Sequence, residues 1–307
     1  MALLIVAPNR DTQAVQEHLR KQDPTLDIRI WPVIGNANDI DFAVVWKHPP
    51  ELLTQLPALK AISSYGAGVE GILNDPLLPG DLPVGRISGP RLAADMAEFV
   101  TAVIINQHRG LWGFYEDQKA QRWQPWAPVG TPRVGLLGSG NMGAACARVL
   151  LSLGYEVHCW NRSGSGELDL TYHRGEAGLQ QMASICDFLV CLLPLTEHTQ
   201  GILNADLFAQ MKAGSYLINV GRGDHLVEAD LINALDQQQL SGAYLDVFQH
   251  EPLPADHPFW SHPGVLMSPH CASFTLPEEA ARLIYQSYCQ VQQGKGPLDA
   301  INRQQGY

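Results

Sequence analysis

Short apolar runs alternate with segments of mixed polar and apolar residues along the whole chain. In the first 90 residues the runs that predict strands are residues 2–7, 26–31, 42–46, 61–64 and 84–87. Segments such as residues 12–21 and 51–56 lie between them and carry a helical pattern. Alternating strands and helices predict a parallel sheet with helices on both faces, and ligands of such sheets bind at the carboxyl ends of the strands.

The second half of the chain repeats this alternation. Its predicted strands are residues 155–160, 185–193, 216–220, 243–247 and 265–268, and its predicted helices are residues 144–153, 204–211, 227–239 and 277–293. Between the halves, residues 90–120 carry apolar positions near the helical period and predict one long helix. Prolines and tryptophans in residues 121–128 end it in a loop that we expect a partner subunit to cover.

Length and composition limit the class of protein. A chain of 307 residues is long for one hydrophobic core, and two domains are expected. No apolar run is long enough to span a membrane, and the N-terminal run lacks the basic start of a signal peptide. The six cysteines form no Cys-x-x-Cys pair, which favours reduced thiols in a cytoplasmic enzyme and indicates no metal site. A net charge of -11 argues against nucleic acid and anionic membranes as partners.

Three glycines at dinucleotide spacing follow an apolar run that begins at Val134. Gly138 permits a tight turn, Gly140 lets a pyrophosphate approach the backbone, and Gly143 lets the next helix pack closely. Ser139, Asn141 and Met142 fill the turn. Turns are often rich in glycine, but a strand before the motif and a helix and strand after it favour nucleotide binding.

The end of the second strand of this unit indicates which nucleotide binds. NAD enzymes usually place an acid there for the ribose 2′-hydroxyl, whereas this chain has Asn161, Arg162 and Ser163, and no acid before Glu167. An arginine suits a 2′-phosphate that an ionised acid would repel. The alternative is a solvent-facing arginine in a turn. We expect NADPH, with NADH binding more weakly.

Several strand ends carry candidate chemistry. Residues 63–70 resemble an anion nest, or equally a glycine turn before a helix beginning near Val69, and Trp46 reads alone as a core aromatic. Arg222, Glu251 and His270 each follow a different strand of the nucleotide unit and should emerge at one edge. A salt bridge between Arg222 and Glu251 and a capping role for His270 are the structural alternatives.

Taken together, these motifs resemble the D-isomer-specific 2-hydroxyacid dehydrogenase family. The resemblance extends over nearly the whole chain, and the motifs that carry it are residues 65–69, 138–143, 159–163, 219–223, 245–248, 251–254 and 269–270, and the closing Gly306-Tyr307. The family often has Asp where Glu70 stands. The resemblance implies an α/β fold of two doubly wound parallel-sheet domains: a flavodoxin-like substrate domain of residues 1–95 plus 278–307, and a Rossmann domain of residues 96–277.

The resemblance also implies roles. His270 would donate the proton because imidazole titrates near neutrality, Glu251 would orient it, and Arg222 would bind the keto-acid oxygens. Ala67 and Gly68 would hold the substrate carboxylate beside Trp46. The further residues expected at the cofactor are Leu193, Pro194, Thr199, Val220 and Gly221, with Asp246 at the nicotinamide carboxamide.

The implied reaction is NADPH-dependent reduction of small 2-keto acids, glyoxylate to glycolate or hydroxypyruvate to glycerate, in a homodimer whose domains close over the substrate. Two alternatives stay open: a related dehydrogenase with a bulkier keto acid or NADH, and a nucleotide-sensing binding protein without catalysis. The histidines without motif context, which we expect in surface or turn positions, are His48, His198, His250, His257 and His262.

Overall fold

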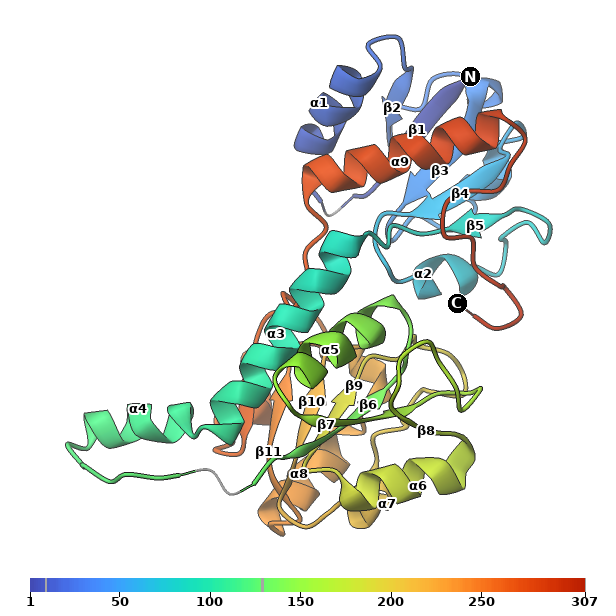
Figure 1. The fold of residues 1–307 in the computed structure, drawn as a ribbon. Coiled ribbons are helices and arrows are strands. Elements are labelled where there is room, and N and C mark those ends of the chain that lie inside the picture. The colour runs from blue at the N-terminus through green and yellow to red at the C-terminus, as the bar shows by residue number, and fades with distance from the viewer. Residues whose placement is uncertain (9, 128–129, 307) are drawn as a thin grey trace. The chain divides into compact units, whose positions relative to one another are not determined.

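The computed structural model describes residues 1–8, 10–127 and 130–306, so Pro128 of the predicted loop and Tyr307 of the closing pair lie outside it (Figure 1). Within the described residues the chain forms two compact units, one of residues 1–91 with 275–307 and the other of residues 92–274. The domain limits expected from the sequence were 95 and 278, and they remain a prediction.

The first unit is built on a five-stranded parallel sheet in the order β2-β1-β3-β4-β5. Its strands are β1 (Ala2–Val6), β2 (Ile28–Ile30), β3 (Ile40–Val45), β4 (Ala61–Ser64) and β5 (Val84–Gly85). β1, β3 and β4 are fully buried, as expected of parallel strands covered on both faces. The strand order reverses between β1 and β3. The loops that follow the strands at such a topological switch point form ligand sites.

Two layers cover this sheet. α1 (Gln13–Gln22) and α9 (Pro277–Gln292) pack together on one face, with Leu19 and Ile284 in the same apolar cluster as Phe42. The opposite face is covered by the short helices η2 (Leu52–Gln55) and α2 (Glu70–Leu73). The remaining one-turn helix, η1 (Ala37–Asp39), leads into β3. α2 begins where the sequence predicted, next to Val69.

The second unit is built on a seven-stranded parallel sheet in the order β12-β11-β10-β9-β6-β7-β8. Its strands are β6 (Arg133–Leu137), β7 (Glu156–Trp160), β8 (Thr171–His173), β9 (Phe188–Cys191), β10 (Ser215–Asn219), β11 (Leu240–Leu245) and β12 (Val265–Met267). The direction changes between β6 and β9, which is the arrangement of a dinucleotide-binding sheet. The predicted fold class of two parallel-sheet α/β units is confirmed.

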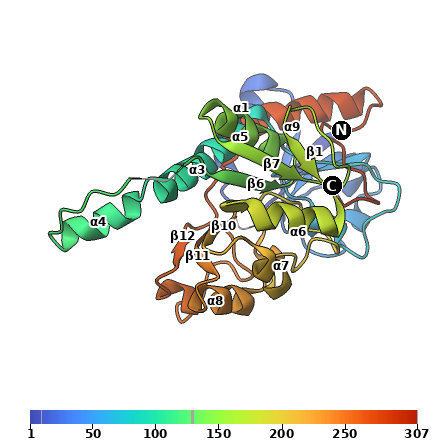
Figure 2. The ribbon, with the colours of Figure 1, turned by 60° about the horizontal axis from the view of Figure 1, so that its bottom comes forward.

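Helices lie on both faces of the second sheet (Figure 2). α3 (Pro90–His108) and α5 (Asn141–Ser152) share one apolar cluster with β6 and β10. α6 (Gly175–Ile185), α7 (Ala205–Gln210) and α8 (Glu228–Asp236) share the other. The short helices η3 (Gly223–His225) and η4 (Pro258–Trp260) connect strands. No helix among the described residues is long and apolar enough to cross a membrane.

Two sequence predictions about elements were wrong. The single helix expected over residues 90–120 is two helices, because Gly110 adopts a left-handed conformation (φ +65°) between α3 and α4 (Leu111–Lys119). Both views show α4 and the chain after it reaching out beyond the sheet and its covering helices (Figures 1 and 2). Residue Ile185 ends α6 and does not start a strand, and neither α6 nor β8 was predicted.

Candidate active site

The glycine turn after β6 has the shape that a bound pyrophosphate requires. Gly138 adopts φ +108°, a conformation that side chains disfavour. A Cβ atom at Gly143 would lie 2.1 Å from the carbonyl oxygen of Gly138, whereas one at Gly140 would meet no atom within 4 Å. The turn is therefore closed against the helix and open on its outer side, where the first amides of α5 can donate to an anion. Met142 instead packs on the core.

A second loop, residues 161–166, is tied to this turn. The Nδ2 atom of Asn161 donates to Ser139 Oγ at 2.5 Å, and its Oδ1 accepts from the Gly164 amide at 2.6 Å. Ser163 Oγ also bonds to Asn161 Oδ1, at 3.1 Å. Arg162 is exposed on this loop. The residues expected at the adenosine end of a nucleotide thus form one bonded loop.

Sequence reasoning missed a second arginine here. A Cβ atom at Gly164 would lie 2.9 Å from Cδ of Arg174, so the stem of Arg174 lies against the loop that carries Arg162. Arg174 follows the edge strand β8, and because β8 was not predicted from the sequence, nothing placed Arg174 beside the loop.

The segments expected along the rest of a nucleotide also meet. Gly138 approaches the carbonyl of Leu192 and the side chain of Leu193, which joins the glycine turn to the loop after β9. In that loop Thr199 Oγ1 donates to Pro194 O at 2.7 Å and accepts from the Thr196 amide at 2.8 Å. Val220 and Gly221 are buried at the end of β10.

His225, which carried no sequence signal, links these loops. Its ring is fully buried; Nδ1 accepts from the Arg222 amide at 3.0 Å, which leaves the hydrogen on Nε2 for Pro194 O at 3.3 Å. A turn of this kind fixes the backbone at Gly221 and Arg222.

The three predicted catalytic side chains lie on neighbouring loops at the carboxyl edge of this one sheet. His270 Nδ1 lies 2.8 Å from Glu251 Oε2, and Glu251 Oε1 accepts from the Phe248 amide at 3.1 Å. A Cβ atom at Gly223 would overlap the backbone of Phe248 and Gln249, so the turn after Arg222 packs directly on the segment before Glu251. Arg222 Nη1 donates to Gly221 O at 2.7 Å.

The carboxylate of Glu251 is kept ionised by these neighbours. Partial burial alone would raise the pKa of Glu251, but the hydrogen bond with His270 and the positive charges of His270 and Arg222 outweigh it, so the pKa lies below its usual value.

Asp246 holds the loop that carries His270. Its side chain is 1% exposed, and its two oxygens accept from Ser268 Oγ at 2.5 Å, from the Cys271 amide at 2.8 Å and from the Ala272 amide at 2.9 Å. Its carbonyl oxygen accepts from the His270 amide at 2.8 Å, where His270 is held at φ +53°. Asp246 therefore fixes the strained backbone of His270, and its expected contact with a carboxamide remains a prediction.

The expected substrate-binding residues lie at the carboxyl edge of the sheet of the first unit. Ser64 Oγ donates to Gly68 O at 2.5 Å and accepts from the Gly66 amide at 3.3 Å, which folds the turn. The Ala67 and Gly68 amides donate no hydrogen bond to any residue of the described ranges, so they can receive an anion. The half-buried Trp46 ring packs on Gly66.

His48 was expected in a surface or turn position; it lies in the loop after β3, but its side chain is buried. The His48 side chain is 2% exposed, and its Nε2 lies 2.9 Å from Asp75 Oδ2, whose side chain is 4% exposed. The pair fastens the loop after Trp46 to the segment after α2. His48 has no motif context, and a partner 27 positions away in the chain leaves no local signature.

An open glycine turn and a His–Glu pair beside an arginine, on one edge of a Rossmann sheet, define a nucleotide-dependent oxidoreductase. The family described as D-isomer specific 2-hydroxyacid dehydrogenase, NAD binding domain, matches residues 101–272. The chain belongs to the D-isomer-specific 2-hydroxyacid dehydrogenase family, which confirms the resemblance seen in the motifs. It is therefore an NAD(P)-dependent enzyme of the 2-hydroxyacid dehydrogenase class.

Individual relatives match over the whole chain. The glyoxylate/hydroxypyruvate reductase A of Yersinia enterocolitica is 36% identical over 296 residues, 94% of each protein. A D-isomer specific 2-hydroxyacid dehydrogenase from Xanthobacter autotrophicus Py2, solved with NADPH and MES, has a TM-score of 0.95 at 34% identity and covers 100% of this chain and 99% of its own. An NADPH-dependent glyoxylate/hydroxypyruvate reductase from Sinorhizobium meliloti, solved with NADP and sulfate, has a TM-score of 0.92 at 32% identity, with 100% of both chains covered.

Proposed function

We propose that this enzyme reduces small 2-keto acids with NADPH, converting glyoxylate to glycolate and hydroxypyruvate to D-glycerate. The observation that carries the proposal is the His270–Glu251 pair, 2.8 Å apart, beside Arg222 on the edge where the glycine turn opens. The names of the Yersinia and Sinorhizobium relatives supply the keto acids.

The proton comes from His270. With Nδ1 held by Glu251, Nε2 is the ring nitrogen that can give its proton to the carbonyl oxygen of the substrate. NADPH, when bound, would supply the hydride for the carbonyl carbon. Glu251 stabilises the charged ring before the transfer, because its carboxylate remains ionised. Arg222 binds the keto-acid oxygens and stabilises the negative charge that grows on the carbonyl oxygen. The amides of Ala67 and Gly68 receive the substrate carboxylate.

NADPH is the proposed cofactor because two arginines, Arg162 and Arg174, lie at the loop that follows β7, where an NAD-selective enzyme would have an acid. Asn161 and Ser163 shape this loop. The structures of the Xanthobacter and Sinorhizobium proteins, which contain NADPH and NADP, agree with this choice. The free thiols, four of them buried, suit a reducing compartment such as the cytoplasm.

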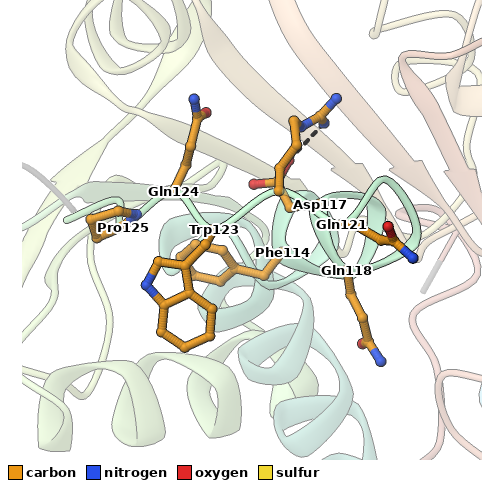
Figure 3. A pocket seen from close by; sticks show the side chains of 8 residues that line it. Phe114, Asp117, Gln118, Gln121, Trp123, Gln124 and Pro125 are labelled. Atoms are coloured by element: carbon orange, nitrogen blue, oxygen red, sulfur yellow. Dashed lines mark hydrogen bonds and ion pairs between the residues drawn. The ribbon is translucent and has the colours of Figure 1, made fainter.

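The proposed assembly is a homodimer formed through α4 and the loop after it. None of the residues of α4 is buried, and Trp123 is 97% exposed. Figure 3 shows Trp123 and Phe114 beside a surface hollow between the helix and the loop. A helix that buries nothing gains little from folding alone, so a second copy seated on this segment would supply the missing apolar contact.

Steady-state kinetics tests the proposed reaction. The purified enzyme is given NADPH or NADH with glyoxylate, hydroxypyruvate, pyruvate and phenylpyruvate, and the loss of reduced-nicotinamide absorbance is followed. The proposal expects the highest kcat/KM with NADPH and one of the first two acids. A preference for phenylpyruvate or for NADH would favour a different dehydrogenase, and nucleotide binding without turnover of any acid would favour a nucleotide-sensing protein.

A further inference from the structure

An arginine stacks on two aromatic side chains at the switch point of the first unit's sheet, and nothing in the proposed reaction uses its guanidinium. Arg10 follows β1 and Trp46 follows β3, and these strands are neighbours where the strand order changes direction. Tyr65 follows β4, the next strand along. Three loops at the edge where parallel sheets bind ligands therefore bring one guanidinium close to two aromatic side chains.

The guanidinium of Arg10 lies over the Trp46 ring and farther from the Tyr65 ring. Its Cζ is 4.2 Å from the centroid of the Trp46 ring and 5.6 Å from that of Tyr65. Such stacking uses the face of the guanidinium and leaves its N–H edge for a planar acceptor such as a carboxylate. Arg10 is exposed, and no carboxylate of the described residues lies within 4.0 Å of it; its neighbour Asp11 accepts from the Gln13 amide at 2.9 Å instead.

The stack is joined to the turn that would bind the substrate carboxylate. A Cβ atom at Gly66 would lie 3.1 Å from the Trp46 ring, so the ring packs directly on the turn. The next two amides, of Ala67 and Gly68, are the ones that donate to no described residue. The Trp46 ring thus contacts both the turn that carries these amides and the Arg10 guanidinium, and both of these groups attract anions.

A substrate with two anionic groups could bind one at the amides and the other at the Arg10 guanidinium. The chain carries a net charge of -11, so only local cations can attract a doubly charged acid. Lys47, exposed and next to Trp46, adds a second positive charge to the same edge. Burial raises the pKa of Tyr65, so its hydroxyl remains a neutral hydrogen-bond donor beside Arg10.

We propose that Arg10 binds a second carboxylate of the substrate, and that the enzyme therefore prefers four-carbon 2-keto dicarboxylic acids to 2-keto monocarboxylic acids of the same length. This inference rests on the proposed reduction of 2-keto acids and names a specificity-determining residue for it. Arg10 acts on substrate choice and takes no part in proton or hydride transfer.

Two substrates that differ in one group test the inference. Oxaloacetate and 2-ketobutyrate have the same four carbons, and a carboxylate in the first replaces a methyl group in the second. The readout is the ratio of kcat/KM for the two acids, measured with NADPH. Arg10→Gln should lower the ratio by roughly tenfold, the usual effect of one charge-assisted hydrogen bond. Arg10→Lys, which keeps the charge and loses the planar fork, should lower it less.

Arg20 provides the matched control. It is an exposed arginine near the end of α1, at the other end of the helix from the switch point. Arg20→Gln should leave both rates and their ratio unchanged. A fall in both rates by the same factor in Arg10→Gln would show that Arg10 only supports Trp46, and an unchanged ratio would show that the second carboxylate does not reach it; either result overturns the inference.

Failure of the inference can be told apart from failure of the proposed reaction. Glyoxylate has no third carbon and cannot reach two anion sites at once. If the wild-type enzyme reduces glyoxylate but shows no Arg10-dependent preference for oxaloacetate, the inference alone is wrong. If it reduces no 2-keto acid, the proposed reaction is wrong and the inference is wrong with it.

Discussion

The Nδ1 atom of His270 lies 2.8 Å from Oε2 of Glu251, although 19 residues separate them along the chain. The two side chains are 42% and 33% exposed, so the pair is accessible to a small substrate. Asp246, buried beneath, holds the backbone on which His270 stands. A proton donor requires an imidazole ring that is held in place through one nitrogen, here Nδ1, so that the other nitrogen, Nε2, can reach the substrate.

Replacement of His270 tests that role. His270→Ala should lower kcat by about 10²–10⁴-fold, the range for loss of a general acid, because water in its place is not oriented. NADPH binding, followed by nucleotide fluorescence, should persist because the glycine turn is untouched. His250→Ala removes an exposed histidine of the loop before Glu251 and should have no effect. Near-normal turnover in His270→Ala would remove the histidine from the mechanism.

Glu251→Gln keeps the size of the side chain and removes its charge. We expect kcat to fall by roughly 10²-fold, because the neutral amide orients the ring less well and does not stabilise its charged form. The pKa of Glu251 lies below its ordinary value of 4.5, so the wild-type carboxylate stays ionised above that pH. The gap between wild type and variant should hold across all pH values above 4.5 and narrow only at lower pH, as the carboxylate is protonated. A gap that closes near neutral pH would contradict the assigned charge state.

Cofactor choice should depend on Arg162 and on Arg174. Arg162→Asp should weaken the binding of NADPH by more than tenfold and that of NADH far less. Only NADPH carries the 2′-phosphate that the new carboxylate repels. Arg174→Gln should act in the same direction more weakly. Arg133→Gln, at the opposite end of β6 and paired with Glu156 at 3.0 Å, is the control that should change neither KM. Equal losses for both nucleotides in Arg162→Asp would reject the phosphate assignment.

The features that could be predicted from the sequence are those that neighbouring residues determine. Gly138, Gly140 and Gly143 stand in a fixed spacing after a buried strand, and the alternation of apolar runs with mixed segments predicts parallel sheets with helices on both faces. The short edge strand β8 escaped notice because a run of serines and glycines precedes it, and Arg174 was missed with it.

Other features depend on tertiary contacts that leave no local trace. His225 carries no sequence signal, and its contact with the Pro194 carbonyl depends on a loop 31 positions away in the chain. The three donors that converge on Asp246 come from residues 22 to 26 positions later. The stack of Arg10 on Trp46 requires that β1 and β3 lie side by side, which the topology decides and the local sequence does not.

The buried pair of His48 and Asp75 should contribute to stability. His48→Ala should lower the free energy of unfolding by about 3 kcal/mol, because it leaves a buried carboxylate without its partner. Lys119→Ala, which breaks an exposed pair with Glu116, should cost less than about 1 kcal/mol. Urea denaturation monitored by circular dichroism measures both. Equal costs for the two variants would show that the buried pair is not a stabilising contact.

The difference in the free energy of unfolding between wild type and His48→Ala should depend on pH in one direction. Burial alone would raise the pKa of Asp75, but the hydrogen bonds from His48 and from the Leu77 amide lower it below its usual 3.8. A carboxyl whose pKa is lower in the folded state stabilises the fold above the unfolded value and loses this effect as pH falls through the folded value. The difference between wild type and His48→Ala should therefore be full at neutral pH and shrink below pH 3.8.

Removal of the exposed tryptophan on the loop after α4 should separate the subunits. Trp123 is 97% exposed in the single chain, so Trp123→Ala costs the folded chain almost no burial and acts on whatever covers the ring. Trp260, 59% exposed and outside this segment, provides the control as Trp260→Ala. Sedimentation velocity should show a dimer for wild type and for Trp260→Ala, and a shift toward monomer for Trp123→Ala at the same concentration, since aromatic anchors carry a large share of interface energy. A wild-type monomer, or a Trp123→Ala dimer of unchanged affinity, would mean that α4 and its loop do not form the interface.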